Sequence, residues 1–349
     1  MTRRCRAMTF AGGEEGVLAP ELSGGFWLQG GPLTMAGLRG RPVLVDFWDY
    51  TCINCLRTLP YLVEWHRRYS PHGLVIVGVH TPEFSFARRP DDVRRAIAEF
   101  GIEYPVVLDA DYAIWRAYNN RFWPAKYLVD AQGRLRYYHF GEGAYQATER
   151  AIQHLLLEVR PDLALPQPLP PLREEDRPGA VCYRVTPEIY LGFLRGAVGN
   201  PTGLVPKQAV RYRDPGLHAE GFFYLDGPWV ADEECVYRPW DALETSRVAL
   251  RYTAREVNLV LNPLAGQPAR LDIWQDGAPL SPDCAGADVR WDDQGQSHLV
   301  VDVPRMFRLV ANGDIGHHEL ALATTTPGLA LYAFTFVSCA IPGWEMRLQ

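Results

Sequence analysis

The chain has 349 residues, of which 47% are hydrophobic and 22% are charged, and its net charge is −6. These values are ordinary for a globular protein of two domains. The excess of acidic residues excludes a basic nucleic-acid-binding surface, and no apolar run is long enough to span a bilayer.

Strand and helix signals alternate between residues 43 and 159. Val43–Trp48 and 73–80 are nearly unbroken apolar runs, which are typical of buried parallel strands. Helical spacing marks Ile53–Tyr69, in which Pro60 predicts a kink. The remaining expected elements are helices over 90–100, 111–119 and 145–159, a strand over 105–108 and a hairpin over 127–140. This order predicts an α/β sheet that ends in an antiparallel hairpin.

Six prolines between residues 161 and 178 predict an extended, semi-rigid linker, because proline disrupts regular backbone hydrogen bonding. The linker sets the expected domain boundaries. We expect an N-terminal extension over 1–20, an α/β domain over 21–160, the linker over 161–182 and a second domain over 183–349.

The second half of the chain carries short strand signals separated by turn residues, and no convincing helix signal from residue 221 onward. Strands are expected over 221–225, 247–252, 256–261, 269–274, 297–303, 305–310, 319–322 and 329–337. Their spacing of roughly 8–12 residues predicts an all-β sandwich of the jelly-roll kind.

Seven cysteines are present, and only Cys52 and Cys55 are close in sequence. The other five are expected to be mostly buried free thiols: Cys5, Cys182, Cys235, Cys284 and Cys339. Arg3 and Arg4 are not followed by the apolar stretch of a signal peptide. From the sequence as written, we therefore expect a cytoplasmic protein.

The pair Cys52–Ile53–Asn54–Cys55 falls where a strand ends and a helix begins. A helix N-terminus stabilises a thiolate on the first cysteine, and the spacing lets the second sulfur close a disulfide. Cys52 would be the exposed nucleophile and Cys55 the resolving thiol. The alternatives are a zinc half-site and two idle thiols, but no second closely spaced ligand pair with zinc geometry follows. Redox chemistry is the favoured interpretation, with no cofactor other than the Cys52–Cys55 disulfide and no metal.

Asp46 lies inside an apolar strand, on the same face as Leu44 and Trp48. Burial makes a carboxylate costly to ionise, so we expect its pKa to be raised and its side chain to accept a proton from Cys55. The alternative is a strand-end aspartate with ordinary hydrogen bonds.

The segment Val45-Asp-Phe-Trp-Asp-Tyr-Thr-Cys-Ile-Asn-Cys55 resembles the active site of thioredoxins. The resemblance implies a cis-proline opposite the cysteines, and Pro124 in Phe122-Trp-Pro-Ala125 matches it. It further implies that Trp48, Trp123 and Pro124 bind the substrate chain. The alternative for Pro124 is an ordinary proline at a strand start.

Longer matches resemble the soluble part of DipZ-type proteins, in which a TlpA-like thioredoxin domain precedes a carbohydrate-binding-module-like sandwich. They include Asp49 to Tyr61, Gly78 to Phe84, Phe140-Gly-Glu-Gly143 and Thr186 to Gly192. That family acts outside the cytoplasm and carries a membrane electron-transfer region of the CcdA kind, which this sequence lacks. Thr51 and the Ile53–Asn54 dipeptide also differ from the residues usual in thioredoxins.

Two other functions are alternatives to a thiol-disulfide oxidoreductase. A peroxidase signature requires proline at position 45 and serine or threonine at 49, where the chain has Val45 and Asp49. A glycan-binding protein could use the sandwich aromatics, but such rings more often fill cores. The candidate rings are Trp229, Tyr237, Trp240, Trp274 and Trp291. His80, Glu83 and Glu142 are assigned no catalytic role.

The sequence therefore predicts a thiol-disulfide oxidoreductase that acts as a reductant of protein disulfides and receives electrons from an upstream dithiol. The expected partners are protein thiols or disulfides, without nucleic acid or a membrane span. For the sandwich, a scaffold or partner-docking role is favoured over glycan binding. The alternative functions are a carbohydrate- or partner-binding protein with an accessory redox domain, or a thiol peroxidase.

Overall fold

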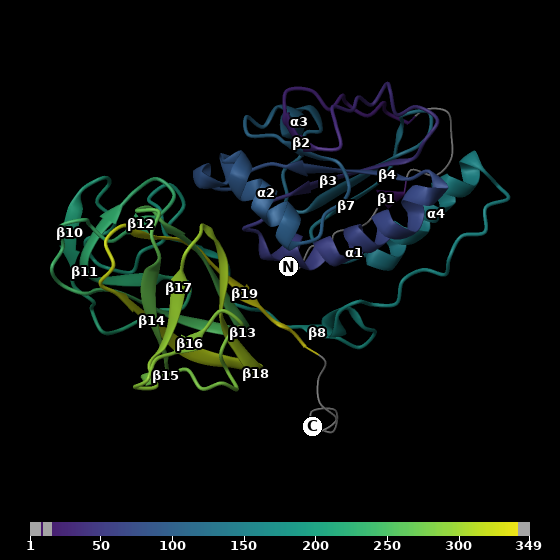
Figure 1. The fold of residues 1–349 in the computed structure, drawn as a ribbon. Coiled ribbons are helices and arrows are strands. Elements are labelled where there is room, and N and C mark those ends of the chain that lie inside the picture. The colour runs from purple at the N-terminus through teal and green to yellow at the C-terminus, as the bar shows by residue number, and fades with distance from the viewer. Residues whose placement is uncertain (1–7, 10–15, 341–349) are drawn as a thin grey trace. The chain divides into compact units, whose positions relative to one another are not determined.

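The computed structural model describes residues 8–9 and 16–340, which form two compact units, Met1–Asp176 and Arg177–Gln349 (Figure 1). Cys5 and most of the expected N-terminal extension lie outside the described residues. Among the residues that the model describes, no helix has the length and apolarity needed to cross a membrane.

A seven-stranded sheet forms the centre of the first unit, in the order β1-β7-β6-β3-β4-β5-β2. The strands are β1 (Met8–Thr9), β2 (Phe26–Gln29), β3 (Val43–Trp48), β4 (Val75–His80), β5 (Val106–Leu108), β6 (Ala125–Val129) and β7 (Leu135–Phe140). The central strand β3 is parallel to β4 and antiparallel to β6. The expected hairpin is β6–β7, whereas β1 and β2 had no clear sequence signal.

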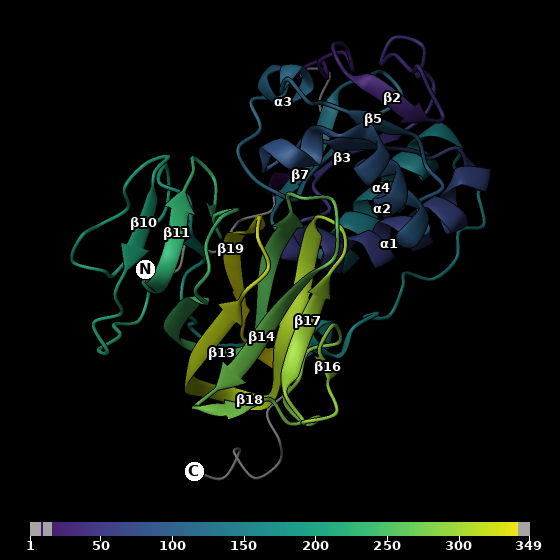
Figure 2. The same ribbon diagram turned by 60° about the vertical axis from the view of Figure 1, so that its left-hand side comes forward.

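Helices cover both faces of this sheet. The α-helices are α1 (Ile53–Tyr69), α2 (Pro90–Glu99), α3 (Ala113–Ala117) and α4 (Tyr145–Val159), and the 3-10 turns are η1 (Ser70–His72), η2 (Ser85–Arg88) and η3 (Glu174–Asp176). Helices α1, α2 and α4 gather on one face and α3 lies on the other (Figures 1 and 2). Acidic residues after Pro90 suit the start of α2, as its sequence predicted.

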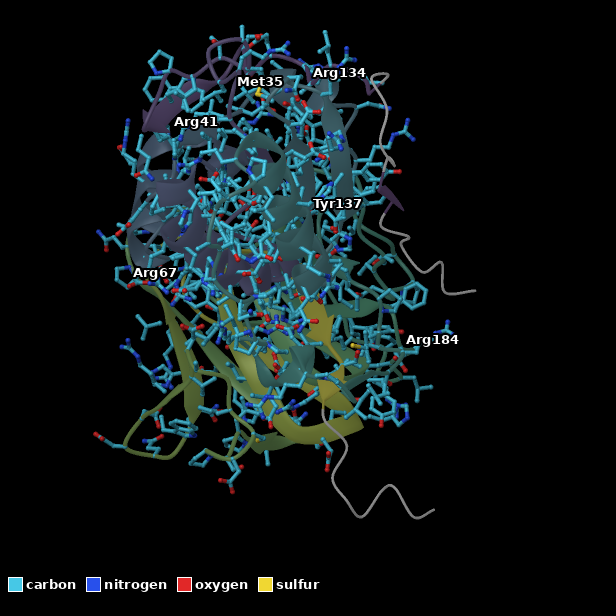
Figure 3. The ribbon with its side chains drawn as sticks, turned by 90° about the vertical axis from the view of Figure 1, so that its right-hand side faces the viewer. Met35, Arg41, Arg67, Arg134, Tyr137 and Arg184 are labelled. Carbon is cyan, nitrogen blue, oxygen red and sulfur yellow. The ribbon has the colours of Figure 1, made fainter. Side chains whose placement is uncertain are left out.

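Side-chain alternation along β3 divides its residues between the two faces. Val43, Val45 and Phe47 belong to the core cluster on the α3 side, where Phe47 contacts the Tyr118 ring. Asp46 therefore points to the opposite face, toward α1 and α4. On that face, Tyr137 of β7 shares a 2.9 Å hydrogen bond with Thr148 of α4, which fastens the helix to the sheet (Figure 3).

The proline-rich segment packs against the first unit as far as Asp176. Glu149 of α4 is fully buried and accepts a hydrogen bond from the Leu169 amide at 2.8 Å. The Tyr61 hydroxyl donates to Asp176 at 2.8 Å and accepts from the Leu172 amide at 2.8 Å. The expected linker is thus held to side chains of α1 and α4 at points from Leu169 to Asp176.

The second unit is built from strands. They are β8 (Val181–Cys182), β9 (Ile189–Tyr190), β10 (Ala209–Tyr212), β11 (Phe223–Ala231), β12 (Val236–Tyr237), β13 (Ser246–Pro263), β14 (Ala269–Gln275), β15 (Ala278–Pro279), β16 (Arg290–Trp291), β17 (Ser297–Val301), β18 (Arg305–Thr324), β19 (Leu329–Val337) and β20 (Cys339–Ala340). Two pairs of expected strands are each one continuous strand, β13 and β18. Both are long enough to change partners: β13 pairs with β11 near its start and with β19 near its end.

This exchange of partners lets one eleven-stranded sheet curve around a single apolar core. Phe223, Leu259 and Phe334 are fully buried in that core. Strands β8 and β20 form a separate pair in which Cys182 lies opposite Cys339.

The scattered cysteines are not all free thiols. Cys182 is disulfide-bonded, which corrects the expectation for that residue. Cys235 is a buried free thiol, as expected, and Cys284 is a partly exposed one. Nothing in the spacing of these residues reveals the disulfide, because β8 and β20 come together only in the folded chain.

Candidate active site

Cys52 and Cys55 lie where β3 leads into α1. Cys52 is the N-cap of the helix, and its sulfur accepts a hydrogen bond from the Cys55 amide at 3.3 Å. Cys52 is partly exposed, whereas Cys55 is 1% exposed. A partner can therefore approach the first sulfur, and the second is shielded behind it.

The electrostatics of the two thiols differ from the sequence expectation. Burial raises the pKa of Cys52, and the charges of Glu83 and Asp49 raise it further, while hydrogen bonds from Cys55 oppose them. Burial raises the pKa of Cys55 well above its ordinary value. Burial thus opposes the stabilisation that the helix N-terminus was expected to give, and the pKa of each thiol lies above its ordinary value.

Asp49 shapes the loop before the cysteines, a role that the sequence analysis missed. The carboxylate is fully buried and accepts from the Thr51 amide at 2.6 Å, the Thr51 hydroxyl at 2.7 Å and the Glu83 amide at 2.6 Å. These donors occupy both oxygens. Asp49 is therefore a structural carboxylate that ties the loop after β4 to the start of α1.

Asp46 has the opposite environment, although it lies only three residues earlier. It is fully buried, and neither carboxylate oxygen has a hydrogen-bond partner among the described residues. Burial raises the pKa of Asp46 to about 7, and the charge of Lys126 opposes this rise. The raised pKa matches the expectation. Asp46 is not the strand-end aspartate with ordinary hydrogen bonds that was the alternative.

Lys126 was also missed. It lies directly opposite Asp46 in the β3–β6 pairing, is fully buried, and its ammonium has no hydrogen-bond partner in the described structure. Burial lowers the pKa of Lys126, opposed by the charges of Asp46 and then Cys55. The signal that could have found it is a charged residue inside the apolar run of β6, the same signal that marked Asp46.

Trp48 is a core residue, which corrects its assignment as a substrate contact. Its side chain is fully buried and packs edge-on against His80 with ring centroids 5.0 Å apart. His80 also stacks on Tyr50, and burial lowers the pKa of His80 to about 3. A ring with no exposed surface cannot contact a substrate chain.

The Trp123–Pro124 peptide bond is cis, as the resemblance implied. Pro124 is buried and Trp123 is partly exposed. The indole nitrogen of Trp123 donates to the Thr81 carbonyl at 2.9 Å, which holds this segment against the loop after β4. Beside it, Phe122 is 52% exposed. Of the expected substrate contacts, Trp123 is therefore the one with accessible side-chain surface.

Two acidic residues near the cysteines have defined surroundings. Glu83 is half-buried, and its charge raises the pKa of Cys52. Glu142, in the loop after β7, forms ion pairs with Arg57 at 3.3 Å and Arg173 at 3.6 Å.

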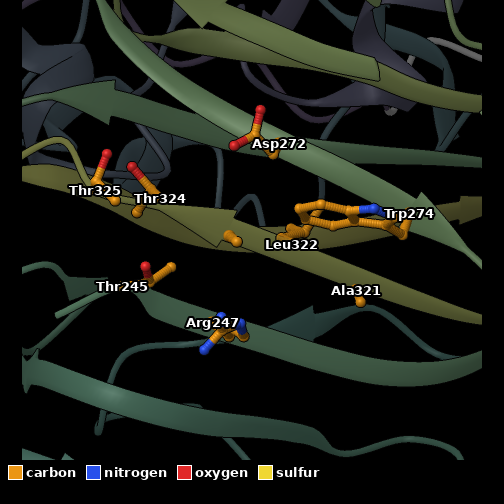
Figure 4. A pocket seen from close by; sticks show the side chains of 9 residues that line it. Thr245, Arg247, Asp272, Trp274, Ala321, Leu322, Thr324 and Thr325 are labelled. Atoms are coloured by element: carbon orange, nitrogen blue, oxygen red, sulfur yellow. The ribbon is translucent and has the colours of Figure 1, made fainter. Parts of the chain in front are cut away.

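The second unit contains a groove of about 430 Å³ on the face of β13, β14 and β18 (Figure 4). Trp274 and Asp272 of β14 lie opposite Ala321 and Ala323 of β18, whose small side chains leave the floor of the groove low. Arg247 of β13 lies at the other side. The groove combines one aromatic ring with a carboxylate and a guanidinium.

The other candidate aromatics are scattered. Trp229 is 1% exposed and belongs to the core, as rings in sandwiches commonly do. Trp240 is 55% exposed, and Trp291 is 39% exposed with its indole donating to the Leu280 carbonyl at 2.7 Å. Tyr237 is half-buried on β12. Only Trp274 among the five lines the groove described above.

Comparison with known proteins agrees with this geometry. Residues 16–138 match the AhpC/TSA family, and residues 186–336 match the family described as thioredoxin like C-terminal domain. The chain is 34% identical to protein DipZ of Mycobacterium tuberculosis over 322 residues, which is 91% of this chain and 42% of that protein. The chain thus spans less than half the length of this relative.

A shorter relative is matched over nearly its whole length. The chain is 32% identical over 142 residues to the thiol-disulfide oxidoreductase YkuV of Bacillus subtilis, covering 40% of this chain and 95% of that protein. Among solved structures, a thiol:disulfide interchange protein of the thioredoxin family from Chlorobium tepidum matches with 23% identity and a TM-score of 0.37, covering 42% of this chain and 99% of that one. The expected fold class, an α/β thioredoxin domain followed by an all-β domain, is confirmed.

Proposed function

Because the chain belongs to the thioredoxin-like thiol-disulfide oxidoreductases, we propose that Cys52 and Cys55 form its redox pair and that it reduces disulfides in other proteins. The observation that carries the proposal is a partly exposed thiol at a helix N-terminus with a second, buried thiol one turn behind it. This arrangement allows a partner sulfur to reach Cys52 while Cys55 remains protected from competing thiols.

The reaction begins when the partly exposed Cys52 thiol loses its proton to solvent and the resulting thiolate attacks one sulfur of a substrate disulfide. A mixed disulfide forms, and the other substrate sulfur leaves as a thiolate. Cys55 then loses its proton to Asp46 and attacks Cys52, which releases the second substrate thiolate. Two electrons pass from the dithiol to the substrate, and an upstream dithiol protein restores Cys52 and Cys55.

The segment around the cis peptide bond is proposed to hold the substrate chain. The Trp123 backbone offers an extended strand edge to the peptide, while Phe122 offers exposed apolar surface. Pro124 contributes the shape of this segment from its buried position. Trp48 has no part in this contact.

A thiol peroxidase is not favoured. The relatives are named as thiol-disulfide oxidoreductases, and Val45 and Asp49 occupy the positions where the peroxidase signature needs other residues. Asp49 is already engaged by three donors.

The test is to trap the reaction intermediate. Cys55→Ser should accumulate a mixed disulfide between Cys52 and a substrate such as insulin, whereas Cys52→Ser should form none. The proposal fails if both variants reduce insulin at the wild-type rate. The direction of electron flow is measured by titrating the pair against glutathione: a potential of roughly −270 mV marks a reductant, and about −120 mV an oxidant.

The compartment stays a prediction. The cytoplasmic expectation is opposed by the disulfide at Cys182, because structural disulfides persist mainly in oxidising environments. Rapid alkylation of cells, followed by mapping of modified cysteines, measures whether Cys182 is oxidised in its native compartment.

A second candidate function rests on the groove of the second unit. We propose that it binds a neutral polyhydroxylated ligand such as an oligosaccharide, because Trp274 offers an aromatic face and Asp272 and Arg247 offer an acceptor and donors. Binding to a panel of polysaccharides that Trp274→Ala weakens would support it. Binding of wild-type strength after this change, or no binding by the wild-type protein, would contradict it.

A further inference from the structure

The disulfide at Cys182 takes no part in the reaction described above. Four of the other cysteines are free thiols: Cys52, Cys55, Cys235 and Cys284. The partner of Cys182 is therefore Cys5 or Cys339. The pairing of β8 with β20 sets Cys339 directly opposite Cys182. Residues opposite each other in an antiparallel pair have Cα atoms about 4.5–5.5 Å apart, a separation that a disulfide spans.

The start and the end of the second unit leave its sheet at the same place. Near the start, the Thr186 amide donates to the Thr253 carbonyl of β13 at 3.0 Å, and the Thr253 amide donates to the Thr186 hydroxyl at 2.7 Å. Near the end, Val337 of β19 lies opposite Glu256 of β13. Thr253 and Glu256 belong to the same part of one strand. The two ends of the unit therefore run side by side beyond the sheet, which is why β8 and β20 meet.

The β8–β20 pair is short and separate from the large sheet. It consists of two residue pairs, Cys182 opposite Cys339 and Val181 opposite Ala340. An isolated two-stranded ribbon is marginally stable in water. A covalent bond across this pair would therefore be the main fastening between the start of the unit and its end.

The surroundings of Cys182 are those of an accessible, extended segment. Cys182 is exposed on β8, and its neighbours Val181 and Tyr183 are 41% and 38% exposed. An extended backbone with exposed apolar side chains suits the segment of Trp123 and Phe122 that is proposed to hold substrates. Exposed disulfides also have higher reduction potentials than protected structural ones, so a dithiol reductant can reduce them.

We propose that Cys182 and Cys339 form a second redox site of this protein, a disulfide clasp that the Cys52–Cys55 dithiol of a second copy of the chain reduces. The inference rests on the proposed function, because it names a substrate for that dithiol. Reduction of the clasp releases the two ends of the second unit from each other.

The exchange follows the same two steps as the reduction of any protein disulfide. The Cys52 thiolate of one copy attacks the Cys182 sulfur of the other, and Cys339 leaves as a thiolate. Cys55 then attacks Cys52, and Cys182 leaves as the second thiolate. One copy ends with a Cys52–Cys55 disulfide, and the other ends with two thiols after its thiolates take up protons from solvent. Two electrons pass between the copies.

Opening the clasp also lengthens the segment that joins the two units. In the first unit this segment is held at Asp176, which accepts a hydrogen bond from a tyrosine of α1 at 2.8 Å. With the clasp closed, the connecting residues are 177–181. With the clasp open, the next anchor is Val185, which packs against the core of the second unit, and the connecting residues become 177–184. Because the reach of a chain grows with its number of residues, the redox state of the clasp sets the reach of this segment.

The first experiment identifies the partner of Cys182. Free thiols of the unreduced protein are alkylated, and the protein is digested and analysed by mass spectrometry. The expected product is a cross-linked peptide pair that contains Cys182 and Cys339. A cross-link between Cys182 and Cys5 would overturn the proposal.

The second experiment lets one copy reduce another. The donor carries Cys182→Ser and Cys339→Ser and is reduced before use, whereas the acceptor carries Cys52→Ser and Cys55→Ser and keeps its clasp. Alkylation and mass measurement should show two new thiols in the acceptor, formed at least about tenfold faster than with a donor that also carries Cys52→Ser. A donor no faster than that control would overturn the proposal.

A matched control and a proteolysis assay complete this experiment. Adding Cys284→Ser, which removes a partly exposed free thiol, to the acceptor should leave its reduction unchanged. Arg184 is exposed beside the clasp (Figure 3). Trypsin should cleave after Arg184 at least about tenfold faster once dithiothreitol has reduced the acceptor, because cleavage follows local opening. Equal cleavage of the oxidised and reduced acceptor would show that the disulfide fastens nothing.

Insulin reduction by the donor distinguishes failure of this inference from failure of the proposed function. The donor should reduce insulin at the wild-type rate, which also shows that it is folded. A donor that reduces insulin but leaves the clasp intact would reject this inference alone. A donor that reduces neither would reject the proposed function, and the inference with it.

Discussion

Among the residues that the structure describes, each unit buries one lysine or arginine side chain, Lys126 or Arg238, and the two have different surroundings. In the second unit, Arg238 is 2% exposed, and its terminal nitrogens donate to the carbonyls of Pro239, Ala242 and Glu244 at 3.4, 2.6 and 3.0 Å. In the first unit, Lys126 has no such partner. The Arg238 guanidinium is held by three carbonyls through its terminal nitrogens, although its Nε has no partner among the described residues. A charge held in this way fixes a local structure, whereas one without fixed partners remains free to respond when a neighbour changes protonation.

The same contrast holds between carboxylates within the first unit. Glu149 is 1% exposed and accepts from Arg68 at 3.0 Å, Tyr69 at 2.6 Å and the Leu169 amide at 2.8 Å. Asp46 accepts from none of the described residues. The lack of hydrogen bonds to Asp46 and Lys126 is therefore particular to their position, because Glu149, a buried carboxylate of the same unit, is hydrogen-bonded.

The largest expected effect is on insulin reduction, and it should differ between a cysteine of the first unit and one of the second. Cys52→Ser should abolish insulin reduction, because it removes the attacking sulfur. Cys235→Ser should leave it unchanged: that thiol is buried in the second unit, and burial raises its pKa to about 12. A turbidity assay of insulin reduction measures both. Loss of activity in Cys235→Ser would show that the second unit takes part in the chemistry.

The next effect concerns the two buried cations directly. Arg238→Met should lower the free energy of unfolding by about 3 kcal/mol, because it leaves buried carbonyls without donors. At pH 5, where Asp46 is protonated, Lys126→Met should lower it by less than about 1 kcal/mol or raise it, because a buried charge without hydrogen bonds is removed. Urea unfolding measures both values. If both substitutions lower the free energy of unfolding equally, the hydrogen bonds of Arg238 do not distinguish it from Lys126.

A pH series sharpens the comparison through Asp46. Its pKa is raised from 3.8 to about 7 on folding, so between these values the folded state binds the proton more tightly than the unfolded state. The contribution of Asp46 to stability therefore falls as the pH rises through this window, by about 1.4 kcal/mol per pH unit at most. Subtracting the unfolding free energy of Asp46→Asn from that of wild type isolates this slope. A flat difference between pH 4 and 7 would show that Asp46 is not a buried, unsatisfied acid.

The smallest expected effect is in the groove of the second unit. Trp274→Ala should weaken binding of a polysaccharide by about fivefold, since one aromatic contact is worth about 1 kcal/mol. Insulin reduction should be unaffected. Trp291→Ala, which changes an exposed tryptophan outside the groove lining, is the matched control. Equal weakening by both changes would show that the groove is not the binding site.

Much of this was predictable because the relevant signals are local. The C-x-x-C pair, the apolar run of β3 and the turn before β7 are short-range patterns. They predicted two cysteines at the start of a helix, the central strand and the hairpin, while the redox role of the cysteines stays a proposal. A charged residue in an apolar strand predicted that Asp46 would be buried with a raised pKa. Family resemblance added Pro124, which no local pattern distinguishes from an ordinary proline.

Other features could be seen only in the tertiary structure, because they depend on which segments far apart in the sequence come together. The position of Lys126 beside Asp46 follows from the pairing of β6 with β3, whose register places the two residues opposite each other. Cys182 is disulfide-bonded in a strand pair that joins residues far apart in the sequence. Trp48, expected at the substrate, is enclosed by His80 and its neighbours. The sequence by itself was enough to propose thiol-disulfide chemistry, because residue type and spacing carry that signal. The register of the strands and the burial of side chains decided which charged groups have hydrogen-bond partners and which have none. Both arise only when strands pair and water is excluded.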